Sequence, residues 1–92
     1  MNSSEDDLKQ RSPTAAWCDD ISLHVRLQDG REISTPLWWY PSLLHATPGQ
    51  RNTVELMLTG IHWPDLDEDL SIDGMLRGWK ASGAVPPAVA AE

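Results

Sequence analysis

The segment of residues 21–27 constrains the fold most strongly, because apolar and polar side chains alternate along it. Its sequence, ISLHVRL, has a period of two. That period is typical of a strand with one buried face and one face in water. An Asp-Gly pair at residues 29–30 and a second short run at residues 31–35 follow it. The pattern predicts a β-hairpin.

The loop length of this hairpin follows from the apolar pattern. A two-residue loop would place Ile33 opposite Arg26, on the polar face. A three-residue loop over 28–30 places Ile33 opposite Val25, on the apolar face. The second register keeps the apolar set together, so we expect a type I turn with Gly30 left-handed in a bulge.

Two short helical turns are expected between residues 37 and 52. Pro41 suits the first position of one turn, and Thr47 suits the N-cap of the other, with Pro48 next and Gln50 completing a capping box. Proline is unfavourable inside a helix, which predicts two turns rather than one helix. Three apolar side chains are expected to share the buried face of the first turn: Trp39, Leu43 and Leu44.

The second half of the chain has strand signals again. Residues 54–58 and 61–63 read as strands joined by a turn, and residues 70–72 as a further extended piece. Asp73 is expected to cap a last helical turn that Gly78 ends. The fold class is therefore α+β: a small, mostly antiparallel sheet of two hairpins with short helical turns, in a single domain.

Composition sets the expected domain boundaries. Residues 1–16 are polar and charged, which predicts a disordered leader. Residues 79–92 are rich in alanine and proline, which predicts a flexible tail. The folded domain is expected over residues 17–78, a length at which a partner or a second copy would add stability.

Charge and cysteine content exclude several classes of protein. The chain has 14 acidic and 7 basic residues, a net charge of −7, which disfavours nucleic acid and anionic membranes as partners. The single Cys18, the lack of a secretory signal and the lack of a long apolar run predict a cytoplasmic protein. Asp19 and Asp20 beside Cys18 are expected to raise its thiol pKa, against a nucleophilic role.

An acidic stretch is the most conspicuous candidate for chemistry. As a calcium loop starting at Asp65 it fails twice, because Leu70 replaces the glycine at the sixth position and Leu76 the glutamate at the twelfth. The pattern favours a solvated connection that meets Arg51 or Arg77. The stretch contains five acids: Asp65, Asp67, Glu68, Asp69 and Asp73.

No other pattern supports an active site. His62 lies near Asp65 and Asp67, but no second histidine or cysteine at metal-ligand spacing completes a site. A glycine-rich phosphate loop and a serine nucleophile elbow are also missing from the sequence. We therefore expect no catalytic residue, no bound metal, no cofactor and no small-molecule substrate.

The aromatic run at residues 38–40 has two interpretations. Consecutive side chains on a turn point in different directions, so all three cannot enter one core. Either one or two of them are buried and the third lies over the surface, or the run forms an interface with a partner. Both interpretations stay open from the sequence. The candidate partner surface combines this run with the acidic stretch: Trp38, Tyr40, Asp65, Asp67, Glu68 and Asp69.

Several segments in order resemble the bacterial domain-of-unknown-function family 2442. They are Asp29-Gly30-Arg31, Pro36-Leu37, Trp39-Tyr40-Pro41 with Leu43-Leu44, the run from Ala46 to Arg51, and Gly60-Ile61-His62-Trp63-Pro64 leading into Asp67-Glu68-Asp69. The resemblance implies a small α+β fold with no assigned activity. It also implies a link to transcription regulators, where some members carry a following helix-turn-helix, and to two-gene pairs of toxin–antitoxin character.

These observations favour a non-enzymatic protein–protein interaction module, as an antitoxin-like partner of a co-encoded protein or as a homodimer. One alternative is a component of a transcription regulator that lacks its own DNA-binding region. A further alternative is a small metal-dependent enzyme.

Overall fold

The alternating segment forms the middle strand of a sheet in the computed structural model, which describes residues 9–87. Strand β2 (Ser22–Leu27) pairs antiparallel with β3 (Glu32–Pro36), and Val25 lies opposite Ile33. Gly30 has a φ of 95°, in the left-handed region. The expected three-residue loop with its left-handed glycine is therefore confirmed.

A further strand, β1 (Pro13–Cys18), lies on the other side of β2. Trp17 pairs with His24, and Ala16 packs against the core. The expected leader is therefore wrong for residues 13–16, while residues 1–8 lie outside the described part. Alanine has weak strand propensity, so this segment depends on the hydrogen-bonding edge that β2 provides.

A second antiparallel sheet contains β4 (Glu55–Leu56), β5 (Gly60–Trp63) and β6 (Glu68–Ser71), with β5 in the middle. The strand expected over residues 54–58 is reduced to two residues. The three apolar side chains that end it are exposed: Leu56, Met57 and Leu58. Alternation alone predicted burial for this segment, but no layer of the described chain covers it.

Short helices join the sheets. The 3-10 turn η1 (Leu37–Trp39) precedes α2 (Pro41–Leu44) and α3 (Pro48–Arg51). The capping box of α3 is confirmed, since Gln50 N donates to Thr47 Oγ1 over 3.1 Å and Thr47 N donates to Gln50 Oε1 over 3.0 Å.

The buried face of α2 is narrower than expected, because Leu43 is buried while Leu44 is partly exposed. Helix α4 (Ile72–Arg77) begins one residue before Asp73. Ser71 is its N-cap, and Ser71 Oγ accepts a 2.8 Å hydrogen bond from Gly74 N. The expected Asp73 cap is therefore wrong, while Gly78 ends the helix with a φ of 80° as expected.

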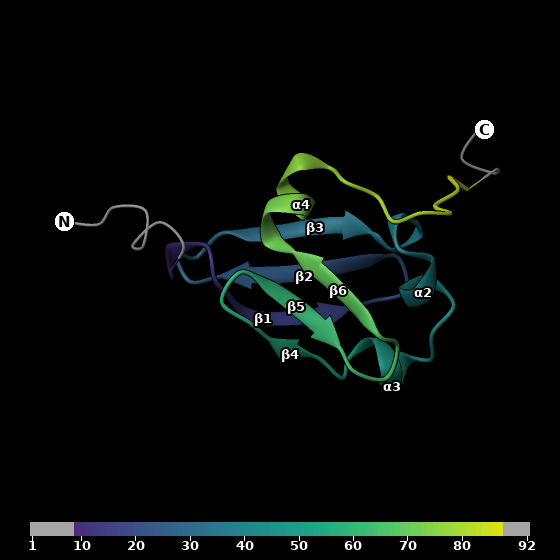
Figure 1. Cartoon of the computed structure of the whole chain (residues 1–92), viewed down its shortest axis with the longest axis horizontal. Helices are drawn as coiled ribbons and strands as arrows, with labels where there is room; N and C mark the ends of the chain where they lie inside the picture. The colour runs from purple at the N-terminus through teal and green to yellow at the C-terminus, as the bar shows by residue number, and fades with distance from the viewer. Residues whose placement is uncertain (1–8, 88–92) are drawn as a thin grey trace.

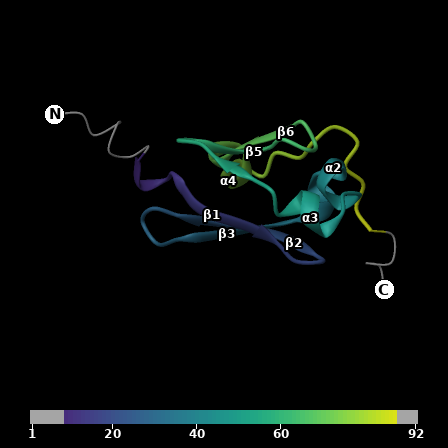
Figure 2. The same cartoon turned by 90° about the horizontal axis from the view of Figure 1, so that it is seen from below.

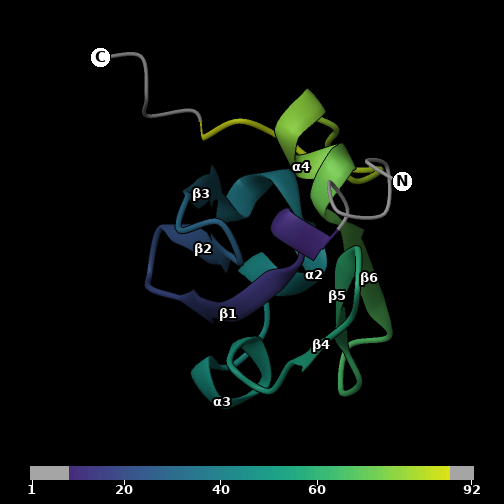
Figure 3. The same cartoon turned by 90° about the vertical axis from the view of Figure 1, so that its left-hand side faces the viewer.

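The two sheets face each other, as Figures 2 and 3 show, with α2 and α3 at one end and α4 beside β3. Figure 1 shows β5 and β6 crossing in front of β1 and β2. The α+β class of a single small domain is confirmed. Within residues 9–87 no helix has the length and apolar character needed to cross a bilayer. The core lies between the sheets: Leu23, Val25, Leu27, Leu37, Tyr40, Leu43, Ile61, Trp63, Ile72 and Met75.

The residues after Gly78 fold back onto the domain. Trp79 N donates to Gly74 O over 3.0 Å, and Ala81 N donates to Trp39 O over 2.9 Å. Ala81 also packs against the core. The expected tail boundary at residue 79 is therefore wrong, because this segment is hydrogen-bonded through residue 81. Residues 88–92 of the expected tail lie outside the described part.

Candidate functional site

Four of the five acids of the stretch lie in the connection between β5 and β6 and at the beginning of β6, and Asp73 lies in α4. Asp65, Asp67 and Asp69 are exposed, and Glu68 is half-buried. Asp67 has a φ of 51°, a left-handed conformation that aspartate tolerates better than most side chains. The stretch is thus a hairpin turn, and Leu70 belongs to the strand that follows rather than to a loop of ligands.

Two acids of the stretch have partners on neighbouring elements. Ser42 Oγ donates to Glu68 Oε1 over 2.5 Å, and His62 Nδ1 lies 2.7 Å from Asp69 Oδ1. The hydrogen bond to Asp69 raises the pKa of His62 above its ordinary value.

Of the two expected arginine partners, Arg77 meets the stretch at Asp73, and neither arginine forms a hydrogen bond or ion pair with residues 65–69 in the described structure. Arg51 donates instead to the carbonyl oxygens of Leu43 and Leu44, over 2.8 and 2.7 Å. Arg77 pairs with Asp73, one turn before it on α4, over 2.8 Å. Among residues 9–87, no three His, Cys, Asp or Glu side chains are grouped so that they could hold a metal ion.

The aromatic run divides between core and surface. Tyr40 is 1% exposed, and its hydroxyl donates to Thr35 Oγ1 over 2.9 Å. Tyr40 is therefore wrong as a member of the partner surface, because its ring is needed between the sheets. Burial also raises its pKa. Trp39 packs partly against the core, and Trp38 remains half-buried at the surface.

Trp38 lines an apolar groove of about 290 Å³. Ile21 and Leu44 also line it, and Val85 lines it from the C-terminal segment. Ile21 is 74% exposed and Val85 is 70% exposed. The sequence placed Ile21 on the apolar face of the strand, but it precedes β2 and points to this groove instead.

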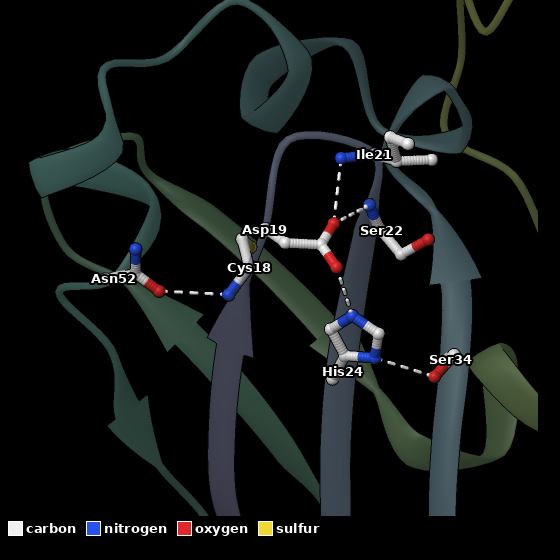
Figure 4. A network of polar contacts seen from close by, with 7 residues as sticks. All are labelled: Cys18, Asp19, Ile21, Ser22, His24, Ser34 and Asn52. Carbon is white, nitrogen blue, oxygen red and sulfur yellow. Dashed lines mark hydrogen bonds and ion pairs between the residues drawn. The ribbon is translucent and has the colours of Figure 1, made fainter.

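A polar row that the sequence did not predict crosses the outer face of the first sheet (Figure 4). Asp19 Oδ1 accepts from the backbone N–H groups of Ile21 and Ser22 over 2.8 and 2.7 Å. Its Oδ2 lies 2.8 Å from His24 Nε2, and His24 Nδ1 lies 2.8 Å from Ser34 Oγ. The row joins the β1–β2 turn to both β2 and β3.

The order of groups in this row is serine, histidine and carboxylate. An ionised Asp19 only accepts, so Nε2 of His24 carries a hydrogen, and Nδ1 of a neutral ring accepts from Ser34. The same order of groups occurs in enzymes that transfer acyl groups through a serine nucleophile. Such catalysis needs hydrogen-bond donors placed around the reacting oxyanion, whereas Ser34 lies exposed in the middle of β3. Trp17 stacks on His24 at 5.5 Å between ring centroids, which fixes the ring further. We infer that the row has a structural role: it stabilises the β1–β2 turn and connects β2 and β3 on the outer face of the sheet.

A pH prediction follows from Asp19. Its hydrogen bonds to His24 and to two backbone amides lower its pKa from 3.8 to about 2. A lowered pKa gives stability that is present above pH 4 and is lost as the pH falls toward 2. Urea unfolding of wild type and Asp19→Asn from pH 5 to 2 should show the difference in unfolding free energy shrinking. A difference that is constant with pH would contradict the prediction.

The environment of Cys18 disfavours its reactive thiolate form. Burial raises its pKa to about 11, and the nearby Arg51 only partly offsets this effect. Asp19 also raises the pKa, as the sequence suggested, but burial is the larger cause.

The fold and these surfaces define a small α+β domain with an apolar groove and an acidic hairpin. The chain belongs to the family described as protein of unknown function (DUF2442), whose model matches residues 13–81. The resemblance stated from the sequence is thereby confirmed. A crystal structure of a protein of unknown function from Rhodospirillum rubrum ATCC 11170 is similar, with 28% identity and a TM-score of 0.68. The alignment covers 79% of this chain and 93% of that one. A search of the curated proteins found no match.

Proposed function

We propose that this protein is a non-enzymatic interaction module that binds another protein through the surface next to its C-terminal segment. The observation that carries this proposal is the apolar groove of Ile21, Trp38, Leu44 and Val85. Covering large apolar side chains that are otherwise in water lowers the free energy and so favours binding of a partner. Tryptophan is also enriched among the residues that dominate binding energy.

The partner in this proposal is a protein encoded beside this one, in an antitoxin-like pair. The net charge of −7 favours a basic partner, because opposite charges steer association. A second copy of the chain is the alternative occupant of the groove.

The test is co-expression with the product of the neighbouring gene, followed by size exclusion with light scattering. We expect co-elution, and Ile21→Ser should weaken the complex by about tenfold or more. The side chain of Ile21 is 74% exposed, so the variant should fold normally. Leu58→Ser, at an exposed leucine outside the groove, is the matched control and should bind as wild type does.

Two results would contradict the proposal. One is a wild-type chain that stays monomeric at high concentration and does not co-elute with the neighbouring product. The other is an equal loss of binding in Ile21→Ser and Leu58→Ser. A dimer mass for the chain alone, lost in Ile21→Ser, would assign the groove to a second copy.

A further inference from the structure

A second hollow, of about 210 Å³, lies between β6, α4 and the segment of residues 79–81. Glu68 and Asp69 line it from β6, and Trp79 lines it from the segment after α4. Tyr40 is also a lining residue, but it is only 1% exposed and offers almost no surface to a ligand. The hollow therefore combines carboxylates and an exposed indole contributed by separate elements.

The wall formed by residues 79–81 is held firmly in place. Its backbone is tied to Gly74 O and Trp39 O by the two hydrogen bonds described above. A Cβ on Gly74 would lie 2.9 Å from Trp79 Cε3, so the glycine lets the indole approach the helix closely. Lys80 Nζ lies 4.5 Å from the centroid of the Trp39 ring, which adds a further attachment. Trp79 is fixed by its backbone, yet 61% of it stays exposed.

Two carboxylates, Glu68 and Asp69, line this hollow against one ammonium group, that of Lys80. Glu68 accepts from Ser42, and Asp69 pairs with His62, but a carboxylate has about four acceptor sites. Asp65 and Asp67 precede them on the same hairpin and add negative charge. Lys80 also lines the hollow, and its ammonium group is already engaged with Trp39 and with Gly78 O. The remaining carboxylate oxygens favour a cation from outside.

We propose that this hollow receives an arginine side chain of the protein partner, and this step rests on the proposed function. A guanidinium group can donate two parallel hydrogen bonds to a carboxylate and can stack on an aromatic ring. The carboxylates match the first property. The indole of Trp79 matches the second, because it stays 61% exposed although Arg77 Cζ lies 5.7 Å from its ring centroid. The segment of residues 79–87 lines this hollow and the apolar groove, so one partner can contact both.

The test uses a capped peptide with three arginines separated by serine and glycine, titrated into the labelled full chain and followed by amide NMR shifts. We expect shifts concentrated at residues 68–71, 74–75 and 79–81. The same peptide with citrulline in place of arginine has the same shape without the charge, and it should bind at least about tenfold more weakly. A lysine peptide should bind less tightly than the arginine peptide.

Variants distinguish binding at the hollow from general electrostatic attraction to the acidic hairpin. Glu68→Gln keeps an acceptor for Ser42 but removes the charge, and it should weaken binding at least about tenfold, as should Trp79→Leu. Asp67→Asn removes one charge from the same hairpin outside the hollow, and asparagine tolerates the positive φ. It should weaken binding less than about threefold. Thermal unfolding of each variant confirms that it is folded.

Three results would overturn the proposal: no localised shifts, equal binding of the citrulline peptide, or equal losses in Glu68→Gln and Asp67→Asn. A co-expressed complex that depends on Ile21 while the arginine peptide does not bind would remove this inference and leave the proposed function standing. Peptide binding at the hollow without any protein complex would remove the proposed function and leave the hollow as an arginine-binding site.

Discussion

Replacing Trp63 by alanine is expected to destabilise the fold by about 3–5 kcal/mol, the usual cost of removing a large core aromatic side chain. Trp63 is 0% exposed and lies between the two sheets. Its Nε1 donates to Arg51 O over 2.8 Å and so connects β5 to α3. Because small domains are stable by only about 5–15 kcal/mol, the variant should lose a large fraction of its stability and unfold at a much lower urea concentration.

Urea unfolding followed by far-ultraviolet circular dichroism measures this loss without relying on tryptophan fluorescence. Trp63→Phe is the matched variant, since it keeps an aromatic ring but leaves Arg51 O with only the weak Cys18 Sγ donor at 3.8 Å. We expect it to cost about 1–3 kcal/mol. If alanine at this position costs less than phenylalanine, the assignment of Trp63 as the central contact between the sheets is wrong.

Gly60→Ala is expected to cost about 1–3 kcal/mol, through steric overlap that the sheet has to relieve. A Cβ at residue 60 would lie 2.6 Å from Leu70 O, a backbone atom of the paired strand β6. Backbone atoms cannot turn away as a flexible side chain can. The β5–β6 ladder must therefore open around residue 60, next to the start of α4.

Gly49→Ala is the control for this substitution. Its Cβ would meet no atom closer than Thr47 Oγ1 at 4.0 Å, and the residue lies exposed in α3. Alanine is favoured over glycine in a helix by roughly 0.5–1 kcal/mol, so this variant should be neutral or slightly stabilised. Chemical denaturation of both variants decides the matter: similar midpoints would show that the overlap with Leu70 O is relieved at no cost.

Several local features could be predicted residue by residue, the first hairpin among them. Val25 opposite Ile33, the left-handed Gly30 and the Thr47 capping box are local arrangements in which a few adjacent residues settle the outcome. The strand of residues 61–63 and the end of α4 at Gly78 were predictable for the same reason. Family membership followed from the order of such short segments.

The candidate site was predicted only in part. The acidic hairpin is exposed as expected, but Tyr40 was assigned to the surface and lies in the core. The cap of α4 is Ser71 rather than Asp73, because the helix starts as soon as β6 ends. The row of Asp19, His24 and Ser34 depends on β1, and no local sequence pattern predicted that β1 pairs with β2.

The sequence by itself determined the local geometry of this protein: the register of the β2–β3 hairpin, the caps and stops that nearby side chains supply, and a strongly negative charge. Those features depend on contacts between residues that are close in the chain. Only the tertiary structure decided which apolar side chains stay exposed and which groups meet across elements. Glu68, Tyr40 and Trp79 line one hollow because β6, the turn before α2 and the segment after α4 converge there. That convergence arises from packing between distant segments, and periodicity along a single segment carries no information about it.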